Sequence, residues 1–147
     1  MLFPVSPRYS FDVPRILAVD FGERRIGLAT CDQTGQVVTP RQTLARRSDA
    51  DAARKIARFC ADEEVEGVVL GIPRSPEGVE SSFADRVRSF GARLSRELAV
   101  PIRFHEETLT SWQAQRVMPF RNKREIDPEA AAILLSDYLS HKSGSPP

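Results

Sequence analysis

The sequence predicts a single α/β domain built on a mixed β-sheet. The chain has 147 residues, a length that favours one domain over two. Three strand-like segments follow one another closely, and helical and strand-like segments then alternate along the rest of the chain. Closely spaced strands pair antiparallel, whereas strands separated by helices usually pair parallel. Both kinds of pairing are therefore expected in one sheet with helices on its faces.

The first three elements are expected to be strands. RILAVD (15–20) is a short apolar run typical of a buried strand, and RIGLATCD (25–32) follows it after a tight turn. QTGQ (33–36) has turn chemistry, and VVTPRQTL (37–44) predicts a third strand. Pro40 within this third segment indicates an edge strand or a bulge, because proline cannot donate a hydrogen bond to a neighbouring strand.

Helices and strands alternate in the rest of the chain. Ser48 and Asp51 have the spacing of a helix-capping pair, and apolar residues recur after them with a helical period. GVVLGI (67–72) is fully apolar, as expected for a strand buried on both faces. The expected elements are a helix over 49–63, a strand over 67–72, a helix over 81–98, a strand over 101–107, a short helix over 110–118 and a final helix over 127–141.

The folded domain is expected to span residues 15–142, between a loose arm at 1–14 and a frayed tail at 143–147. The start of the chain lacks the basic segment of a signal peptide, and no apolar run approaches the roughly 20 residues of a membrane span. Cys31 and Cys60 fit no disulfide framework and are interpreted as buried thiols in a reducing compartment. We therefore expect a cytoplasmic protein with no membrane partner.

The charge balance gives no direct sign of a polyanionic partner. Lys and Arg together number 21, and Asp and Glu together number 20. A surface for nucleic acid would therefore have to arise from local segregation of charge.

Acidic residues stand at the ends of three expected elements. Asp20 ends the first strand, Glu106 and Glu107 end the fifth, and Asp127 opens the last helix. Hard divalent cations such as Mg²⁺ and Mn²⁺ bind carboxylate oxygens, and sites in open sheets gather beyond the carboxyl ends of strands. Each position also has a plainer interpretation: Asp20 as a turn former, Glu107 as a solvated strand end, and Asp127 as a helix N-cap before proline.

The helical phase of the expected helix over 127–141 helps to weigh the cap against the metal ligand at Asp127. Asp127 projects toward the side of the helix that carries its apolar residues, which are Ala131, Leu134, Leu135 and Tyr138. Asp137 lies off that stripe and is interpreted as a surface charge. His105, one of two histidines, is expected to be a structural hydrogen-bonding residue rather than a general base.

Four longer segments carry a more specific signal in combination. ILAVDFGERRIGLATCD, GVVLGIPRSPEGVES, IRFHEETLTSWQAQ and IDPEAAAILLSDYL, which run from about Arg15 to His141, have the order and spacing found in the YqgF/RuvX-like family. The chain thus resembles that family, which is similar to RNase H-like nucleases and resolvases. The resemblance implies an RNase H-like nuclease domain over 15–142, with a five-stranded mixed sheet flanked by helices on both faces.

The resemblance also implies a metal-dependent active site. The family's first-strand Asp corresponds to Asp20, the Glu of its D-E-R motif to Glu107, and the Asp that opens its last helix to Asp127. These carboxylates are expected to hold one or two Mg²⁺ or Mn²⁺ ions and to support hydrolysis of phosphodiester bonds in structured RNA. The family is associated with maturation of the 5′ end of 16S rRNA. If Asp127 is only a cap, Glu106 is the next candidate for the third ligand.

Two other functions remain open at this point. One is resolution of four-way DNA junctions, an older assignment of the family, which would call for a homodimer with two sites rather than a monomer. The other is a non-catalytic nucleic-acid-binding module in ribosome assembly. Thr108, which replaces the usual Arg of the motif, and a shortened segment over 117–126 favour this last function, whereas the intact carboxylate set favours a nuclease.

Basic residues are expected to hold the nucleic-acid backbone, since contacts of Lys and Arg with phosphates position a strand without reading its sequence. A solvated surface is the plainer interpretation for each. By resemblance, Gly71, Ile72 and Pro73 correspond to the G-[LI]-P turn of the family motif. The candidate nucleic-acid-binding residues are Arg24, Arg25, Gly71, Pro73, Arg74, Arg121, Lys123 and Arg124.

Overall fold

Strands and helices alternate along the chain in the predicted order. The structure, a computed structural model, describes residues 15–73, 82–107 and 128–144. The elements in these ranges are β1 Ile16–Phe21, β2 Arg25–Cys31, β3 Val38–Ala45, α1 Asp49–Asp62, β4 Gly67–Pro73, α2 Ser82–Glu97, β5 Ile102–Glu107 and α4 Pro128–Gly144. The predicted short helix at 110–118 and the predicted arm at 1–14 lie outside the described residues. The last helix continues to Gly144, three residues beyond its predicted end and into the segment expected as a tail.

All five strands form one mixed sheet in the order β3-β2-β1-β4-β5. β1, β2 and β3 pair antiparallel because short turns join them. β4 pairs parallel with β1 on one side and with β5 on the other, since α1 and α2 provide the crossover connections. The predicted mixed sheet is therefore confirmed, and β1 is its central strand.

The proline in the third strand also lies where the sequence predicts. β3 is an edge strand of the sheet. Its register with β2 shifts between Gly27 and Ala29, and Pro40 is the residue opposite Ala29. The edge position and the irregular register together accommodate a residue without a backbone N–H.

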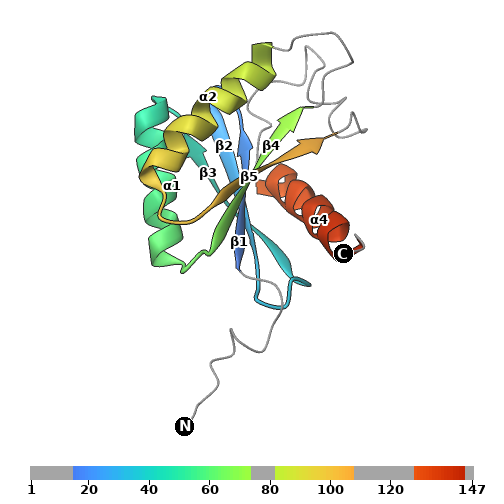
Figure 1. Cartoon of the computed structure of the whole chain (residues 1–147). Helices are drawn as coiled ribbons and strands as arrows, with labels where there is room; N and C mark the ends of the chain where they lie inside the picture. The colour runs from blue at the N-terminus through green and yellow to red at the C-terminus, as the bar shows by residue number, and fades with distance from the viewer. Residues whose placement is uncertain (1–14, 74–81, 108–127, 145–147) are drawn as a thin grey trace.

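The two faces of the sheet bury separate apolar cores. In Figure 1, α1 and α2 lie on one side of the sheet and α4 lies on the other. Leu17, Val19 and Phe21 of β1 belong to the core that contains buried residues of α1 and α2. Ile16 and Ala18 belong to the core that contains Leu134, Leu135 and Leu139 of α4. Successive side chains of β1 therefore pack on opposite faces of the sheet.

The two ends of α1 are closed by hydrogen bonds. Ser48 is the N-cap, and its Oγ accepts a hydrogen bond of 3.0 Å from the backbone N–H of Asp51, as the capping pair predicts. At the other end the N–H of Val65 donates to the carbonyl of Cys60 at 2.9 Å, and Glu64 adopts a positive φ of 58°. This pattern is a Schellman motif with glutamate at the position where glycine is most common.

Both thiols are buried, as predicted, and they belong to different cores. Cys31 belongs to the core under α4, and Cys60 belongs to the core under α1 and α2. Burial raises the pKa of Cys60 to about 12, and burial is also the main cause that raises the pKa of Cys31. Across the described parts of the chain, no helix combines the length and the apolar character needed to cross a membrane.

Candidate functional site

Asp20 is a buried carboxylate near the C-terminal end of the central strand β1. It is only 2% exposed, and it is the one charged residue that is buried among those the structure describes. Its Cα position pairs with Gly27 of β2. Asp20 has the same parity along β1 as Ile16 and Ala18, which places it on the face of the sheet that α4 covers. The interpretation of Asp20 as a turn former is wrong, because the residue is paired within β1 and is not part of the turn that follows.

The strand register connects Asp20 with the fifth strand. Val19 pairs with Leu70 of β4, so the next residues along the two strands are Asp20 and Gly71. Gly71 in turn pairs with His105 of β5, and Pro73 pairs with Glu107. Gly71 and Pro73 thus belong to the C-terminal end of β4.

The other acidic candidates stand at element ends. β5 ends at Glu107, and Glu106 before it is exposed. α4 begins at Pro128, directly after Asp127, as the proline at the first helical position predicts. The side chain of Glu107 and the whole of Asp127 lie outside the described parts of the structure, so their approach to Asp20 stays a prediction.

Two of the candidate basic residues lie beside β1. Arg24 is exposed in the turn between β1 and β2, and Arg25 is half-buried at the start of β2. The remaining candidates, Arg74, Arg121, Lys123 and Arg124, fall outside the described residues.

Arg46 and Arg86 form an ion-pair network near the same turn that the sequence did not reveal. Both guanidinium groups pair with Asp49, through N–O distances of 2.8 Å and 3.3 Å respectively. Both also lie over the ring of Phe21, at 6.0 Å and 5.2 Å from its centroid. Arg46 in addition donates to the carbonyl of Glu23 at 2.6 Å. These arginines tie the turn after β1 to α1 and α2, a role that no local sequence signal indicates.

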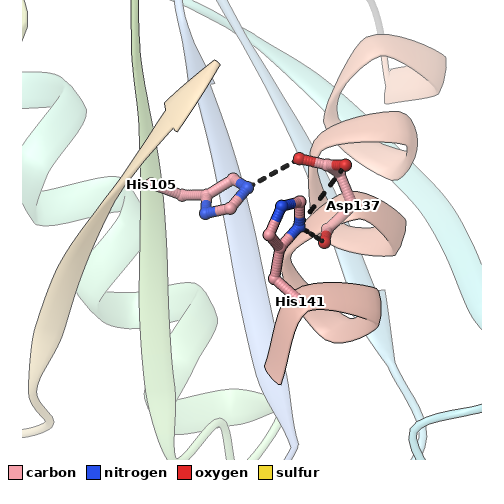
Figure 2. A group of neighbouring side chains, drawn as sticks. All are labelled: His105, Asp137 and His141. Atoms are coloured by element: carbon pink, nitrogen blue, oxygen red, sulfur yellow. Dashed lines mark hydrogen bonds and ion pairs between the residues drawn. The ribbon is translucent and has the colours of Figure 1, made fainter. Parts of the chain in front are cut away.

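A second polar cluster joins β5 to α4 (Figure 2). His105 Nε2 lies 2.7 Å from Asp137 Oδ2, which agrees with the expected hydrogen-bonding role of this histidine. Asp137 is half exposed, as predicted for a surface charge. His141 Nδ1 lies 2.9 Å from the backbone oxygen of Asp137 and 3.7 Å from its Oδ1. The spacing of Asp137 and His141 on one helix face was a usable signal, but only the fold brings His105 to them.

Comparison with known proteins identifies relatives over nearly the whole chain. A family model described as "RuvX: Holliday junction resolvase" matches residues 14–141. A protein from Synechococcus elongatus named "Putative pre-16S rRNA nuclease" is 36% identical over 132 residues, which is 86% of this chain and 89% of the relative. A protein of the same name from Chloroflexus aurantiacus is 34% identical over 137 residues, with 89% and 90% of the two chains covered.

Solved structures with low sequence identity share the fold. Thermus thermophilus RuvC in complex with a Holliday junction substrate has a TM-score of 0.57 at 11% identity, and the match covers 90% of this chain and 97% of that one. A second structure of RuvC from the same organism has a TM-score of 0.53 at 10% identity, with 89% and 97% covered. The fold is therefore RNase H-like, as expected, and the sequence matches establish that the chain belongs to the RuvX (YqgF) family.

Proposed function

We propose that this protein is a divalent-metal-dependent nuclease that hydrolyses phosphodiester bonds in structured RNA, with precursor 16S rRNA as its substrate. The observation that carries the proposal is the burial of Asp20 in the central strand of an RNase H-like sheet. Charged residues are almost never fully buried unless they are paired or coordinate a metal, so the burial of Asp20 supports a role in cation binding.

The arrangement of the sheet supports a site on the α4 side of β1. Asp20 has the parity of the residues that face α4. His105 contacts Asp137 of α4, and position 107 has the same parity as position 105 along β5. α4 itself starts one residue after Asp127. We therefore propose Asp20, Glu107 and Asp127 as the catalytic carboxylates.

The chemistry of this donor set fits a hard cation. The proposed set consists of three carboxylates and contains no histidine or thiolate. Mg²⁺ and Mn²⁺ prefer such oxygen ligands. Ions bound there would supply an activated water and offset charge on the leaving 3′-oxygen. Asp20 would present its carboxylate at a fixed position, because β1 lies between two neighbouring strands of the sheet.

The names of the relatives support RNA as the substrate. Proteins that align with most of this chain at 34–36% identity carry the name of a pre-16S rRNA nuclease. Arg24, exposed in the turn after β1, is proposed to contact the phosphate backbone near Asp20. The candidate residues Arg25, Gly71 and Pro73 lie on β2 and β4, the two strands that flank β1.

Replacement of Asp20 by asparagine tests the proposal. Asp20→Asn keeps the shape of the side chain but removes the charge that binds a cation, so cleavage should be lost while binding of the RNA persists. Asp62→Asn is a matched control, because Asp62 is an exposed carboxylate at the end of α1. Precursor 16S rRNA is incubated with each variant in Mn²⁺ and in chelator. Cleavage by Asp20→Asn at the wild-type rate would refute the proposal.

A second candidate function, resolution of four-way DNA junctions, has the family description and the RuvC fold in its favour. Cutting both strands of a junction symmetrically needs two sites, so this function requires a homodimer, whereas RNA cleavage is open to a monomer. The mass of the protein in solution and cleavage of a synthetic junction beside precursor rRNA distinguish the two. If the protein binds RNA but cleaves neither substrate in the presence of Mn²⁺, it is instead a non-catalytic assembly module.

A further inference from the structure

Two histidines and an aspartate from different elements converge on the side of the sheet that α4 covers. His105 comes from β5, and Asp137 and His141 come from α4 (Figure 2). One possible ligand atom from each of the three residues lies within 4.8 Å of the other two. The rings of the two histidines are 5.3 Å apart between centroids. We propose that these three residues form a binding site for a zinc-class cation, separate from the proposed catalytic carboxylates.

The ligand types select the kind of metal. Two imidazole nitrogens and one carboxylate oxygen suit Zn²⁺, or Co²⁺ as its spectroscopic substitute, and such three-ligand sites leave a fourth position for water. Mg²⁺ prefers an all-oxygen shell and has little affinity for imidazole. The cluster therefore differs in metal preference from the set Asp20, Glu107 and Asp127.

The spacing of the ligands is also that of a metal chelate. Asp137 and His141 are four residues apart, so they lie on one face of α4 at adjacent turns. A pair of ligands at this spacing on a helix, completed by a third ligand from elsewhere, recurs in zinc sites. Ligand atoms around tetrahedral zinc are roughly 3.3 Å apart, from bonds of about 2.0–2.1 Å. The contact of 2.7 Å between His105 and Asp137 needs to widen only slightly. The side chain of His141 is 68% exposed, so the fourth position of a bound metal would be open to water.

Neighbouring groups hold both rings in position. A carbonyl oxygen only accepts hydrogen bonds, so His141 Nδ1 donates to the backbone oxygen of Asp137 at 2.9 Å. In the neutral ring the other nitrogen then carries a lone pair, which is the usual arrangement of a metal-binding histidine. The ring of Tyr138 meets His105 edge-on at 5.6 Å between centroids and limits its rotation. His105 is itself only 13% exposed, so its ring is already held in place.

The proposed site would connect the two elements on which two catalytic candidates depend. His105 precedes Glu107 by two residues on β5, and Asp137 lies roughly 14 Å along α4 from the start of that helix. A bound cation would therefore hold β5 and α4 together at a point well separated from the start of α4, where Asp127 lies in the sequence. Any effect of this on cleavage rests on the proposed nuclease function, whereas binding of zinc does not.

Metal titration of the full chain tests the site. Zn²⁺ is added to the protein in excess Mg²⁺, which saturates all-oxygen sites, and the Tm is followed; Co²⁺ is added in parallel and its visible absorption is recorded. We expect one equivalent to bind and to raise the Tm, since a ligand that binds only the folded state stabilises it. His141→Ala should weaken binding by more than the roughly 10–100-fold that loss of an outer-shell partner costs.

Controls separate this site from other ligands in the chain. Ser140→Ala changes an exposed neighbour on α4 and should bind zinc as the wild type does. Asp20→Asn should also bind zinc normally, even if it abolishes cleavage. Asp137→Asn should lose zinc binding while its amide oxygen can still accept the hydrogen bond from His105. Equal zinc affinity of the wild type and His141→Ala, or no rise in Tm at micromolar Zn²⁺, would overturn the proposal.

Discussion

Two physical roles are predicted for the single carboxylate of Asp127, a helix cap and a metal ligand. Directly before Pro128, the first residue of α4, an aspartate is a good N-cap. A metal ligand at the same place needs the negative charge as well as the oxygen. Substitutions that keep or remove each property can therefore separate the two roles.

Asp127→Asn is expected to preserve stability and to lower cleavage sharply at limiting Mn²⁺. Asparagine caps a helix about as well as aspartate, but it does not supply the charge that holds a cation. Asp127→Ala should in addition lower the free energy of unfolding by about 0.5–2 kcal/mol. Urea unfolding and cleavage rates over a range of Mn²⁺ concentrations measure the two effects. Full cleavage by Asp127→Asn at low Mn²⁺ would show that the residue is only a cap and would direct attention to Glu106.

At the scale of elements, the C-terminal end of α1 offers a stabilising substitution. Glu64 has a φ of 58°, a left-handed conformation that costs a residue with a Cβ about 1–2 kcal/mol. Glu64→Gly should raise the free energy of unfolding by roughly 0.5–1 kcal/mol, because the relief of strain exceeds the extra entropy of glycine in the unfolded chain. Urea denaturation measures the change.

A glycine three residues earlier is the matched control. Ala61 lies in the last turn of α1, where the backbone is helical, so Ala61→Gly should lower stability by up to about 1 kcal/mol. Opposite signs for the two glycine substitutions are the expected result. A loss of stability in both variants would mean that the conformation of Glu64 carries no strain.

The elements themselves were largely predictable, because their signals are local. The apolar run before Asp20, the capping pair at Ser48 and Asp51, and the proline in β3 each act within a few residues. The contacts that were missed join distant parts of the chain. Arg86 lies 37 residues from Asp49, and His105 lies 32 residues from Asp137, so only the assembled sheet brings them together.

The candidate site, too, could be predicted only where its signals are local. The position of Asp20 could be predicted, since the end of a buried strand is readable from hydrophobicity alone. Its burial on the face under α4 depends on strand parity across the whole sheet. The proposed convergence with Glu107 and Asp127 came from the family resemblance, because no local pattern states which strand ends meet.

At the scale of the whole molecule, one sheet has an apolar core on each face, and each core contains one of the two thiols. The labelling of each thiol therefore measures the opening of one core. Because each thiol is buried, we expect Cys60 to react only when the core under α1 and α2 opens, and Cys31 only when the core under α4 opens. The raised pKa of each thiol further suppresses alkylation near neutral pH, because the thiolate is the reactive form and is scarce below the pKa.

Both thiols are therefore expected to resist iodoacetamide at pH 8 and to become reactive at the same concentration of urea. The strands belong to both cores, so loss of either core should unfold the sheet as one cooperative unit. Mass spectrometry of labelled peptides follows each thiol along the urea transition. Labelling of Cys31 at a distinctly lower urea concentration than Cys60 would show that α4 detaches first.

The position of α4 after all five strands has a consequence for synthesis on the ribosome. β1, β2 and β3 leave the exit tunnel first and can pair locally, whereas the helix that covers their second face is the last described element to emerge. A nascent chain therefore holds Asp20 long before it has Asp127 or the apolar residues of α4. With Asp127 as a proposed ligand, the nuclease stays inactive until α4 has been synthesised, and a chain released before that point lacks both a ligand and a core.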